Sequence, residues 1–160
     1  VYKSGQNAYI RTPRKGINFR YNLEDEITLG KGIELLDGKD VAIIATGIVM
    51  VDEAMKAASL LKEKGIEATV VDLHTIRPLD TALIEKVAER TGRILVCENG
   101  RYSGGVGEMI AGHLATVHPT KMSFLNVGER YGEVGNLSYL KEAFGFTAEN
   151  IVDKVMGLLA

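Results

Sequence analysis

The sequence predicts an α/β domain in which a mostly parallel sheet is covered on both faces by helices. Short apolar runs typical of buried strands alternate with amphipathic stretches of ten or more residues, which is the pattern of such folds. The length of 160 residues and the apolar content of 46% are those of one domain with a short additional segment. An Asp37-Gly38 turn signal after residues 33–36 further predicts that this first run lies antiparallel to the others.

The first 30 residues differ from the rest of the chain. Residues 9–11 predict a short strand, which Pro13 and Gly16 end, because proline lacks an amide proton and glycine favours turns. Residues 18–29 are polar, acidic and irregular, as a linker is. We therefore place a boundary near Glu26 and expect two parts, residues 1–26 and residues 27–160.

The remaining elements follow in regular order. We expect strands over residues 33–36, 41–45, 68–73, 94–97 and 122–127. Helical spacing of apolar residues predicts helices over residues 51–61, 81–90 and 106–117, a short one ending at Gly145, and a last one carrying residues 151–159. Asp80, Asn136 and Thr147 are side chains that cap helix N-termini, and Gly92 is a typical C-terminal cap.

Composition excludes several classes of function. The 19 Lys and Arg residues against 21 Asp and Glu residues give a net charge of −2, which argues against a nucleic-acid partner. The single cysteine, Cys97, excludes a disulfide framework and a cysteine-rich zinc site. No apolar run approaches the ~18 residues of a membrane span, and no signal region is present at residue 1, so we expect no membrane partner and a cytoplasmic location.

The standard catalytic motifs are incomplete. Gly105 and Gly107 supply two glycines of a dinucleotide-binding fingerprint, but Ile110 occupies the third position. Ser103 half resembles a hydrolase nucleophile, yet we expect it to cap the helix that starts near Gly104. The three histidines lack zinc-ligand spacing. We therefore predict no catalytic, cofactor-binding or metal-binding residue in this chain, and an inert Cys97 in the core.

Two positions at predicted strand ends are candidates for contact with another molecule. His74 lies just after a strand end, at the edge where ligand sites form in α/β sheets, and a structural or interface role is the alternative. Glu98 also stands at a strand end, where carboxylates are often functional. An ion pair between Glu98 and Arg93 or Arg101 is an equally weighted alternative to a functional role.

Arg11 and Arg14, on either side of Pro13, could form a fork for a phosphate or a carboxylate. Their spacing fits a solvated turn equally well.

Several segments together resemble the C-terminal part of the transketolase family of thiamine-diphosphate enzymes. The resemblance covers nearly the whole chain in order and spacing, and residues 72–80 are its most specific part. The matching segments are residues 9–14, 38–47, 71–80, 92–98, 104–107 and, at the end, 127–151.

The resemblance implies a five-stranded mixed sheet with one antiparallel strand between two helical layers. It also implies that residues 1–14 are the last strand of a preceding pyrimidine-binding domain. In the family, thiamine diphosphate and Mg²⁺ lie between two other domains, on a motif that begins Gly-Asp-Gly. This chain has only Leu36-Asp37-Gly38. We therefore expect the isolated chain to bind neither and to be inactive, with His74, Arg77 and Glu98 as interface candidates.

Three branches of the family are possible assignments for this chain. They are transketolase, which transfers a ketol unit between sugar phosphates, deoxyxylulose-phosphate synthase, and the β subunits of 2-oxoacid dehydrogenases. The segment around Pro13 resembles the first two, in which an arginine holds substrate phosphate, and we favour Arg14 over Arg11 for that role. Residues 72–76 look most like transketolases split into two polypeptides.

The leading interpretation is therefore the C-terminal subunit of a split transketolase. It implies N-terminal domains or an N-terminal subunit as partner, in a homodimer or heterotetramer. A free-standing module that binds an anion or a protein is the alternative from another class.

Overall fold

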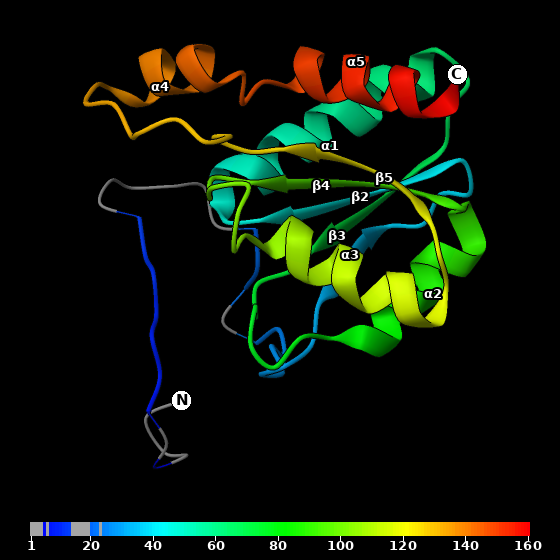
Figure 1. The fold of residues 1–160 in the computed structure, drawn as a ribbon, viewed down its shortest axis with the longest axis horizontal. Coiled ribbons are helices and arrows are strands. Elements are labelled where there is room, and N and C mark those ends of the chain that lie inside the picture. The colour runs from blue at the N-terminus through cyan, green and yellow to red at the C-terminus, as the bar shows by residue number, and fades with distance from the viewer. Residues whose placement is uncertain (1–4, 6, 14–19, 23) are drawn as a thin grey trace.

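Five strands form the middle layer of the computed structural model, which describes residues 5, 7–13, 20–22 and 24–160 (Figure 1). The sheet has the order β1-β3-β2-β4-β5, and β1 pairs antiparallel with β3 while the other three pairs are parallel. The strands are β1 (Ile33–Leu36), β2 (Val41–Thr46), β3 (Ala68–Asp72), β4 (Arg93–Glu98) and β5 (Lys121–Leu125). The predicted mixed five-stranded α/β architecture is thus confirmed.

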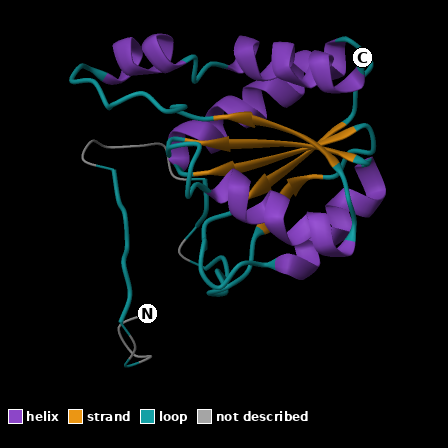
Figure 2. Ribbon diagram, in the orientation of Figure 1, coloured by secondary structure: helices purple, strands orange, loops and turns teal. Residues whose placement is uncertain are grey.

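Helices cover both faces of this sheet (Figure 2). One face packs against α1 (Ile48–Glu63) and α5 (Ala148–Leu159), and the other against α2 (Thr81–Thr91) and α3 (Val106–Val117). Apolar side chains on β2 and β4 alternate between the two resulting cores, because successive residues of a strand point to opposite faces. The short α4 (Leu137–Phe144) continues the α5 layer beyond the sheet and buries none of its residues fully.

The predicted helix caps form as local sequence indicated. Asp80 accepts a hydrogen bond from the amide of Leu83, and Asn136 and Thr147 do the same for α4 and α5. Gly92 ends α2 in the left-handed conformation that glycine adopts without steric cost. The sequence alone predicts these helix ends, because each cap and its partner lie within four residues of each other.

One predicted strand is absent, and the bounds of several elements differ from the prediction, most clearly those of β5. Residues 9–11 form no strand, and Tyr9 is 89% exposed, because none of the five strands supplies hydrogen-bond partners there. β5 ends at Leu125 rather than at Val127, because the side chain of Asn126 accepts from the amide of Gly128 and turns the chain.

The Asp37-Gly38 turn joins β1 to β2, although β3 lies between them in the sheet. Thr69 Oγ1 accepts from the Gly38 amide at 3.0 Å and donates to the Gly38 carbonyl at 2.6 Å. A Cβ at Gly38 would overlap the backbone of Glu67, so this close approach requires glycine.

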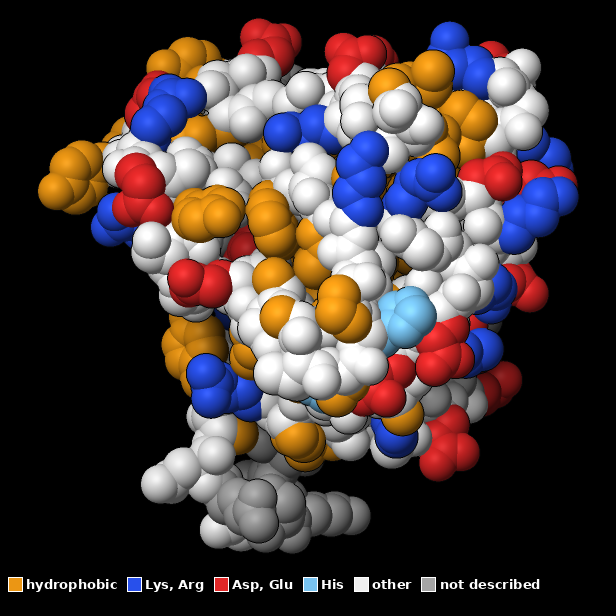
Figure 3. Space-filling view, turned by 45° about the vertical axis from the view of Figure 1, so that its right-hand side comes forward, with side chains coloured by type: hydrophobic (Ala, Val, Ile, Leu, Met, Phe, Trp, Pro, Cys, Tyr) orange, Lys and Arg blue, Asp and Glu red, His pale blue; other side chains and the backbone are white. Residues whose placement is uncertain are grey.

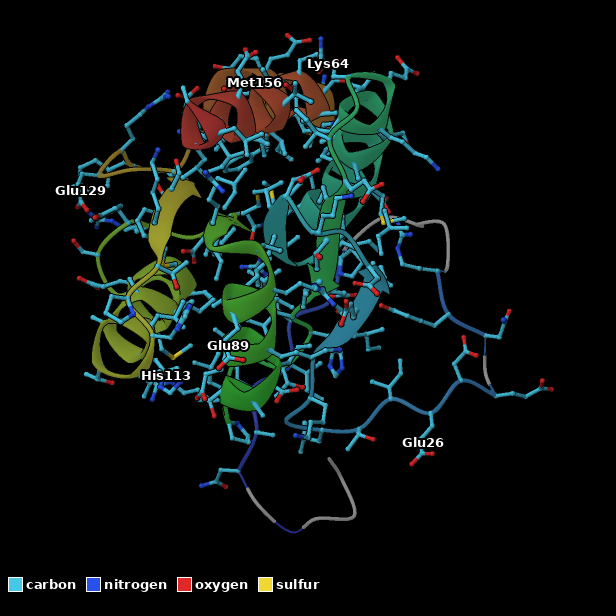
Figure 4. The ribbon with its side chains drawn as sticks, turned by 90° about the vertical axis from the view of Figure 1, so that its right-hand side faces the viewer. Glu26, Lys64, Glu89, His113, Glu129 and Met156 are labelled. Atoms are coloured by element: carbon cyan, nitrogen blue, oxygen red, sulfur yellow. The ribbon has the colours of Figure 1, made fainter. Side chains whose placement is uncertain are left out.

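The linker is irregular from residue 24 to residue 32, and Glu26 lies on it away from the sheet (Figure 4). It is nevertheless attached to the domain, because Tyr21 donates a hydrogen bond of 2.8 Å to Asp72 at the end of β3. The boundary near Glu26 stays a prediction. No helix in the described ranges has the length and apolar content that crossing a membrane requires.

Candidate functional site at the carboxyl edge of the sheet

The strand order changes direction between the neighbouring parallel strands β2 and β4, so a topological switch point lies at their carboxyl ends. From β2 the chain continues to β3 on one side, and from β4 it continues to β5 on the other. Ligands in open α/β sheets bind at such a topological switch point. Thr46 and Glu98, the last residues of the two strands, are paired in register, so Gly47 and Asn99 follow side by side.

Glu98 caps α3 from inside the domain. Its side chain is buried, with 4% of the residue exposed, and its two oxygens accept hydrogen bonds of 2.9 Å from the amides of Val106 and Gly107. A carboxylate is favoured there because the first amides of a helix are unpaired and carry partial positive charge.

Neither ion pair considered for Glu98 forms, since both of its oxygens bind backbone amides. Arg101 instead pairs with Glu129 at 2.8 Å.

The capping role expected for Ser103 is therefore wrong. Gly105 is the N-cap residue of α3 and offers no side chain, and Ser103 donates its hydroxyl to Glu129 at 3.0 Å. The prediction failed because it used proximity along the chain. Glu98 reaches the helix across a loop of seven residues, and only the fold brings the two together.

Arg11 lies at the same edge. Its Nη2 donates a hydrogen bond to the side-chain oxygen of Asn99. A Cβ placed on Gly47 would lie 3.8 Å from Arg11 Nη2 and 3.8 Å from Asn99 Oδ1, so the pair sits directly over the strand-to-helix turn. Sequence reasoning missed Asn99, which carries no motif of its own. Arg14, the favoured phosphate ligand, lies outside the described residues.

His74 and Arg77 occupy the loop after β3 at this edge. His74 Nδ1 lies 3.0 Å from Thr75 Oγ1, whereas its Nε2 is buried and has no hydrogen-bond partner among the described residues. A buried polar atom in a native protein is nearly always paired. The exposed Arg77 precedes Pro78 through a cis peptide bond.

Asp72 and Tyr21 complete the edge on the β3 side. Burial raises the pKa of Asp72 above its usual value, although the hydrogen bond from Tyr21 acts in the opposite direction. Burial and the same hydrogen bond raise the pKa of Tyr21 well above 10. The Tyr21 hydroxyl therefore stays protonated, and its hydrogen bond to Asp72 attaches the linker to the domain.

Asp37-Gly38, the part of the chain nearest to a diphosphate motif, does not fit the cofactor. It lies between the end of β1 and the start of β2, at the opposite edge of the sheet from Arg11, and Asp37 pairs with Arg90 at 2.6 Å. Among the described residues, no three His, Cys, Asp or Glu side chains are grouped as metal ligands. Asp37 is thus engaged in an ion pair away from the carboxyl edge and does not form the diphosphate motif.

Cys97 and His113 have structural rather than catalytic roles. Cys97 is fully buried, and burial raises the pKa of its thiol, so the thiolate is strongly disfavoured. His113 Nε2 lies 2.7 Å from Glu85 Oε1, which ties α3 to α2, the helix that carries Glu89 in Figure 4.

Hydrophobic side chains also gather on the surface, among charges of both signs (Figure 3). Around α4 this exposed set consists of Tyr131, Val134, Leu137 and Tyr139. Clustered exposed apolar residues mark contact surfaces more often than isolated ones do.

Comparisons with known proteins agree with this fold. Residues 30–151 match the family model described as "Transketolase, C-terminal domain". The chain is 42% identical over 145 residues to a 6-deoxy-6-sulfo-D-fructose transketolase subunit from Clostridium sp. (strain MSTE9), covering 91% of this chain and 45% of that subunit. It is 38% identical over 147 residues to a 1-deoxy-D-xylulose-5-phosphate synthase from Heliobacterium modesticaldum, covering 89% of this chain and 22% of the synthase.

A solved split-gene transketolase, described as an inactive β4 tetramer, superposes with a TM-score of 0.85. It is 33% identical, and the match covers 91% of this chain and 48% of that one. The chain spans less than half of each of these proteins. Since the family model matches most of its length, the chain belongs to the transketolase C-terminal domain family.

Proposed function

We propose that this chain is the C-terminal part of a split transketolase, which transfers a two-carbon ketol unit between sugar phosphates. The observation that carries the proposal is the superposition on a split-gene transketolase with a TM-score of 0.85 at 33% identity. The similarity to a transketolase subunit at 42% identity supports it independently. The enzyme is expected in the cytoplasm.

In this proposal the chain acts as a scaffold, and the reactive groups belong to other domains. Thiamine diphosphate and Mg²⁺ are bound by the partner domains or subunit, which the ion pair of Asp37 with Arg90 supports, since it engages the part of this chain nearest to a diphosphate motif. What the chain contributes is a rigid edge: Glu98 fixes the loop of residues 99–105 against α3. Rigid positioning matters, since a displacement of about 1 Å can lower an enzymatic rate a hundredfold.

His74 and Arg77 are our candidates for contact with the partner polypeptide. The buried Nε2 of His74 has no hydrogen-bond partner in the part of the chain that the structure describes. This supports the role, because a partner polypeptide can supply the missing hydrogen bond. Glu98, the third candidate, acts indirectly, since its carboxylate is turned into the domain.

Arg11 and Arg14 are proposed to bind the phosphate of the substrate. The position of Arg11 at the switch point of the sheet supports the proposal, since a guanidinium presents a fork of donors to a phosphate. Arg14 remains a candidate on sequence grounds alone.

A second candidate function is deoxyxylulose-phosphate synthesis from pyruvate and glyceraldehyde phosphate. The 38% identity to a 1-deoxy-D-xylulose-5-phosphate synthase favours it. The two functions share the domain and differ in the donor, so the choice between pyruvate and a ketose phosphate separates them.

The deciding experiment mixes the full chain with its cognate N-terminal polypeptide, thiamine diphosphate and Mg²⁺, and measures transfer from a ketose phosphate to an aldose phosphate. Transfer that requires both polypeptides supports the proposal. Consumption of pyruvate with glyceraldehyde phosphate would favour the synthase, and decarboxylation of a 2-oxoacid alone would favour the dehydrogenase β subunit. Anion or peptide binding without any rescued turnover would favour a free-standing module.

A further inference from the structure

Asn99 is held in place by its two chain neighbours. Glu98 before it is paired in register with Thr46 and bound to two amides of α3. Gly100 after it accepts a hydrogen bond of 2.9 Å from the amide of Val127. The backbone is thus fixed on both sides while the Asn99 side chain itself is exposed at the carboxyl edge.

The side chain of Asn99 contacts Arg11, 88 residues away in the sequence. The acceptor is a neutral amide oxygen, and no ion pair joins Arg11 to an acidic side chain within the described residues. A guanidinium has five donor hydrogens, and one bond to Asn99 leaves the others for a ligand. A neutral acceptor therefore orients the guanidinium without cancelling its positive charge, whereas a carboxylate in its place would compete with an anion.

We propose that Asn99 is a positioning residue, which holds the guanidinium of Arg11 in the orientation that binds the phosphate of the sugar substrate. This inference rests on the proposed phosphate-binding role of Arg11. It makes the C-terminal domain part of substrate specificity, through a side chain that touches no substrate.

The hydrogen bond between Asn99 and Arg11 contributes little to the stability of the domain. Hydrogen bonds between exposed side chains contribute little to the free energy of folding. Loss of the Asn99 side chain is therefore expected to leave the fold unchanged, and its effect is expected on phosphate recognition.

The test uses the assembled enzyme and compares a phosphorylated ketose with the corresponding unphosphorylated ketose. Asn99→Ala is expected to raise the KM of the phosphorylated ketose about threefold to tenfold, the value of one hydrogen bond. It should leave kcat within about twofold, and the KM of the unphosphorylated ketose unchanged, because the change acts on phosphate binding alone.

A double-mutant cycle shows whether Asn99 acts through Arg11. The variant that combines Arg11→Ala with Asn99→Ala is expected to be no worse than Arg11→Ala alone, since the second change has nothing left to orient. Asn99→Asp keeps an acceptor of the same size but adds a negative charge, so it too should weaken phosphate binding. The matched control is Asp37→Ala, which removes an exposed contact to Arg90 at the opposite edge.

The outcomes distinguish failure of the positioning role of Asn99 from failure of the phosphate-binding role of Arg11 on which it rests. If Arg11→Ala raises the KM of the phosphorylated ketose and Asn99→Ala does not, the positioning role is wrong and the phosphate site stands. If Arg11→Ala has no effect on either ketose, both the phosphate role of Arg11 and the inference are overturned. Additive effects in the double variant would likewise contradict action through Arg11. Titration with inorganic phosphate gives a readout independent of turnover, with weaker binding expected in each single variant.

Discussion

Oε1 of Glu98 accepts a hydrogen bond of 2.9 Å from the amide of Gly107, so the last residue of β4 closes the first turn of α3. The second oxygen does the same for Val106. This relationship explains how α3 can begin directly after Gly105, an N-cap residue without a side chain. It also fixes the loop that carries Asn99 to the edge of the sheet.

Replacement of Glu98 by alanine is expected to destabilise the domain by about 2 to 4 kcal/mol, because two buried amides lose their acceptor. Glu98→Gln keeps one accepting oxygen and should lose less. Urea unfolding of the isolated chain, followed by circular dichroism, measures both. An alanine variant as stable as the original chain would show that the two hydrogen bonds contribute nothing.

Glu53 predicts a pH dependence of stability. Its carboxylate accepts from Lys141 at 2.6 Å, from Lys56 at 2.7 Å and from the amide of Ala148 at 3.0 Å. Burial acts to raise its pKa, but the hydrogen bonds from the two lysines prevail and hold the pKa below the usual 4.5. A depressed pKa in the folded state gives stability that is present above pH 4.5 and is lost as pH falls through the lower folded value.

The test compares the free energies of unfolding of the original chain and Glu53→Gln between pH 7 and pH 3. The Gln variant is expected to be less stable at pH 7 by about 1 to 2 kcal/mol, and the difference should shrink below pH 4.5. Glu63→Gln, at an exposed position on the same helix, is the control and should show no such change. A difference that is constant with pH would rule out the assigned role of Glu53.

Tyr21→Phe tests the attachment of the linker. The variant loses the hydrogen bond to Asp72 and should make the linker more accessible, at a cost of about 1 kcal/mol. Limited proteolysis is expected to cleave residues 20–32 faster in this variant. Tyr9→Phe, at an exposed site, serves as control, and equal cleavage rates in all three proteins would contradict the attachment.

Arg14→Ala tests the residue favoured from sequence. In the assembled enzyme it should raise the KM for phosphorylated substrates about tenfold or more, as expected for a lost charge-assisted contact, and leave cofactor affinity unchanged. Comparison with Arg11→Ala shows which arginine binds the phosphate. An unchanged substrate profile would remove Arg14 from the site.

Local sequence predicted those features that depend on near neighbours. Asp80, Asn136 and Thr147 cap helices within three residues of themselves, and the apolar runs of β2 and β4 indicated strands buried on both faces. The antiparallel direction of β1 also followed from its turn.

Features that depend on residues far apart in the chain could not be predicted from the sequence. Glu98 caps α3 across a loop, and Arg11 meets Asn99 from the far end of the chain, so neither contact leaves a spacing pattern. The strand expected at residues 9–11 failed for a related reason: a strand needs a partner, and the described chain supplies none there.

The central claim is that this chain is a scaffold whose reactive partners lie on other domains. Calorimetric titration of the isolated chain with thiamine diphosphate and Mg²⁺ tests it most directly. The account predicts no saturable, magnesium-dependent binding to the chain alone, and stoichiometric binding once the N-terminal polypeptide is added. Stoichiometric binding to the isolated chain would contradict it.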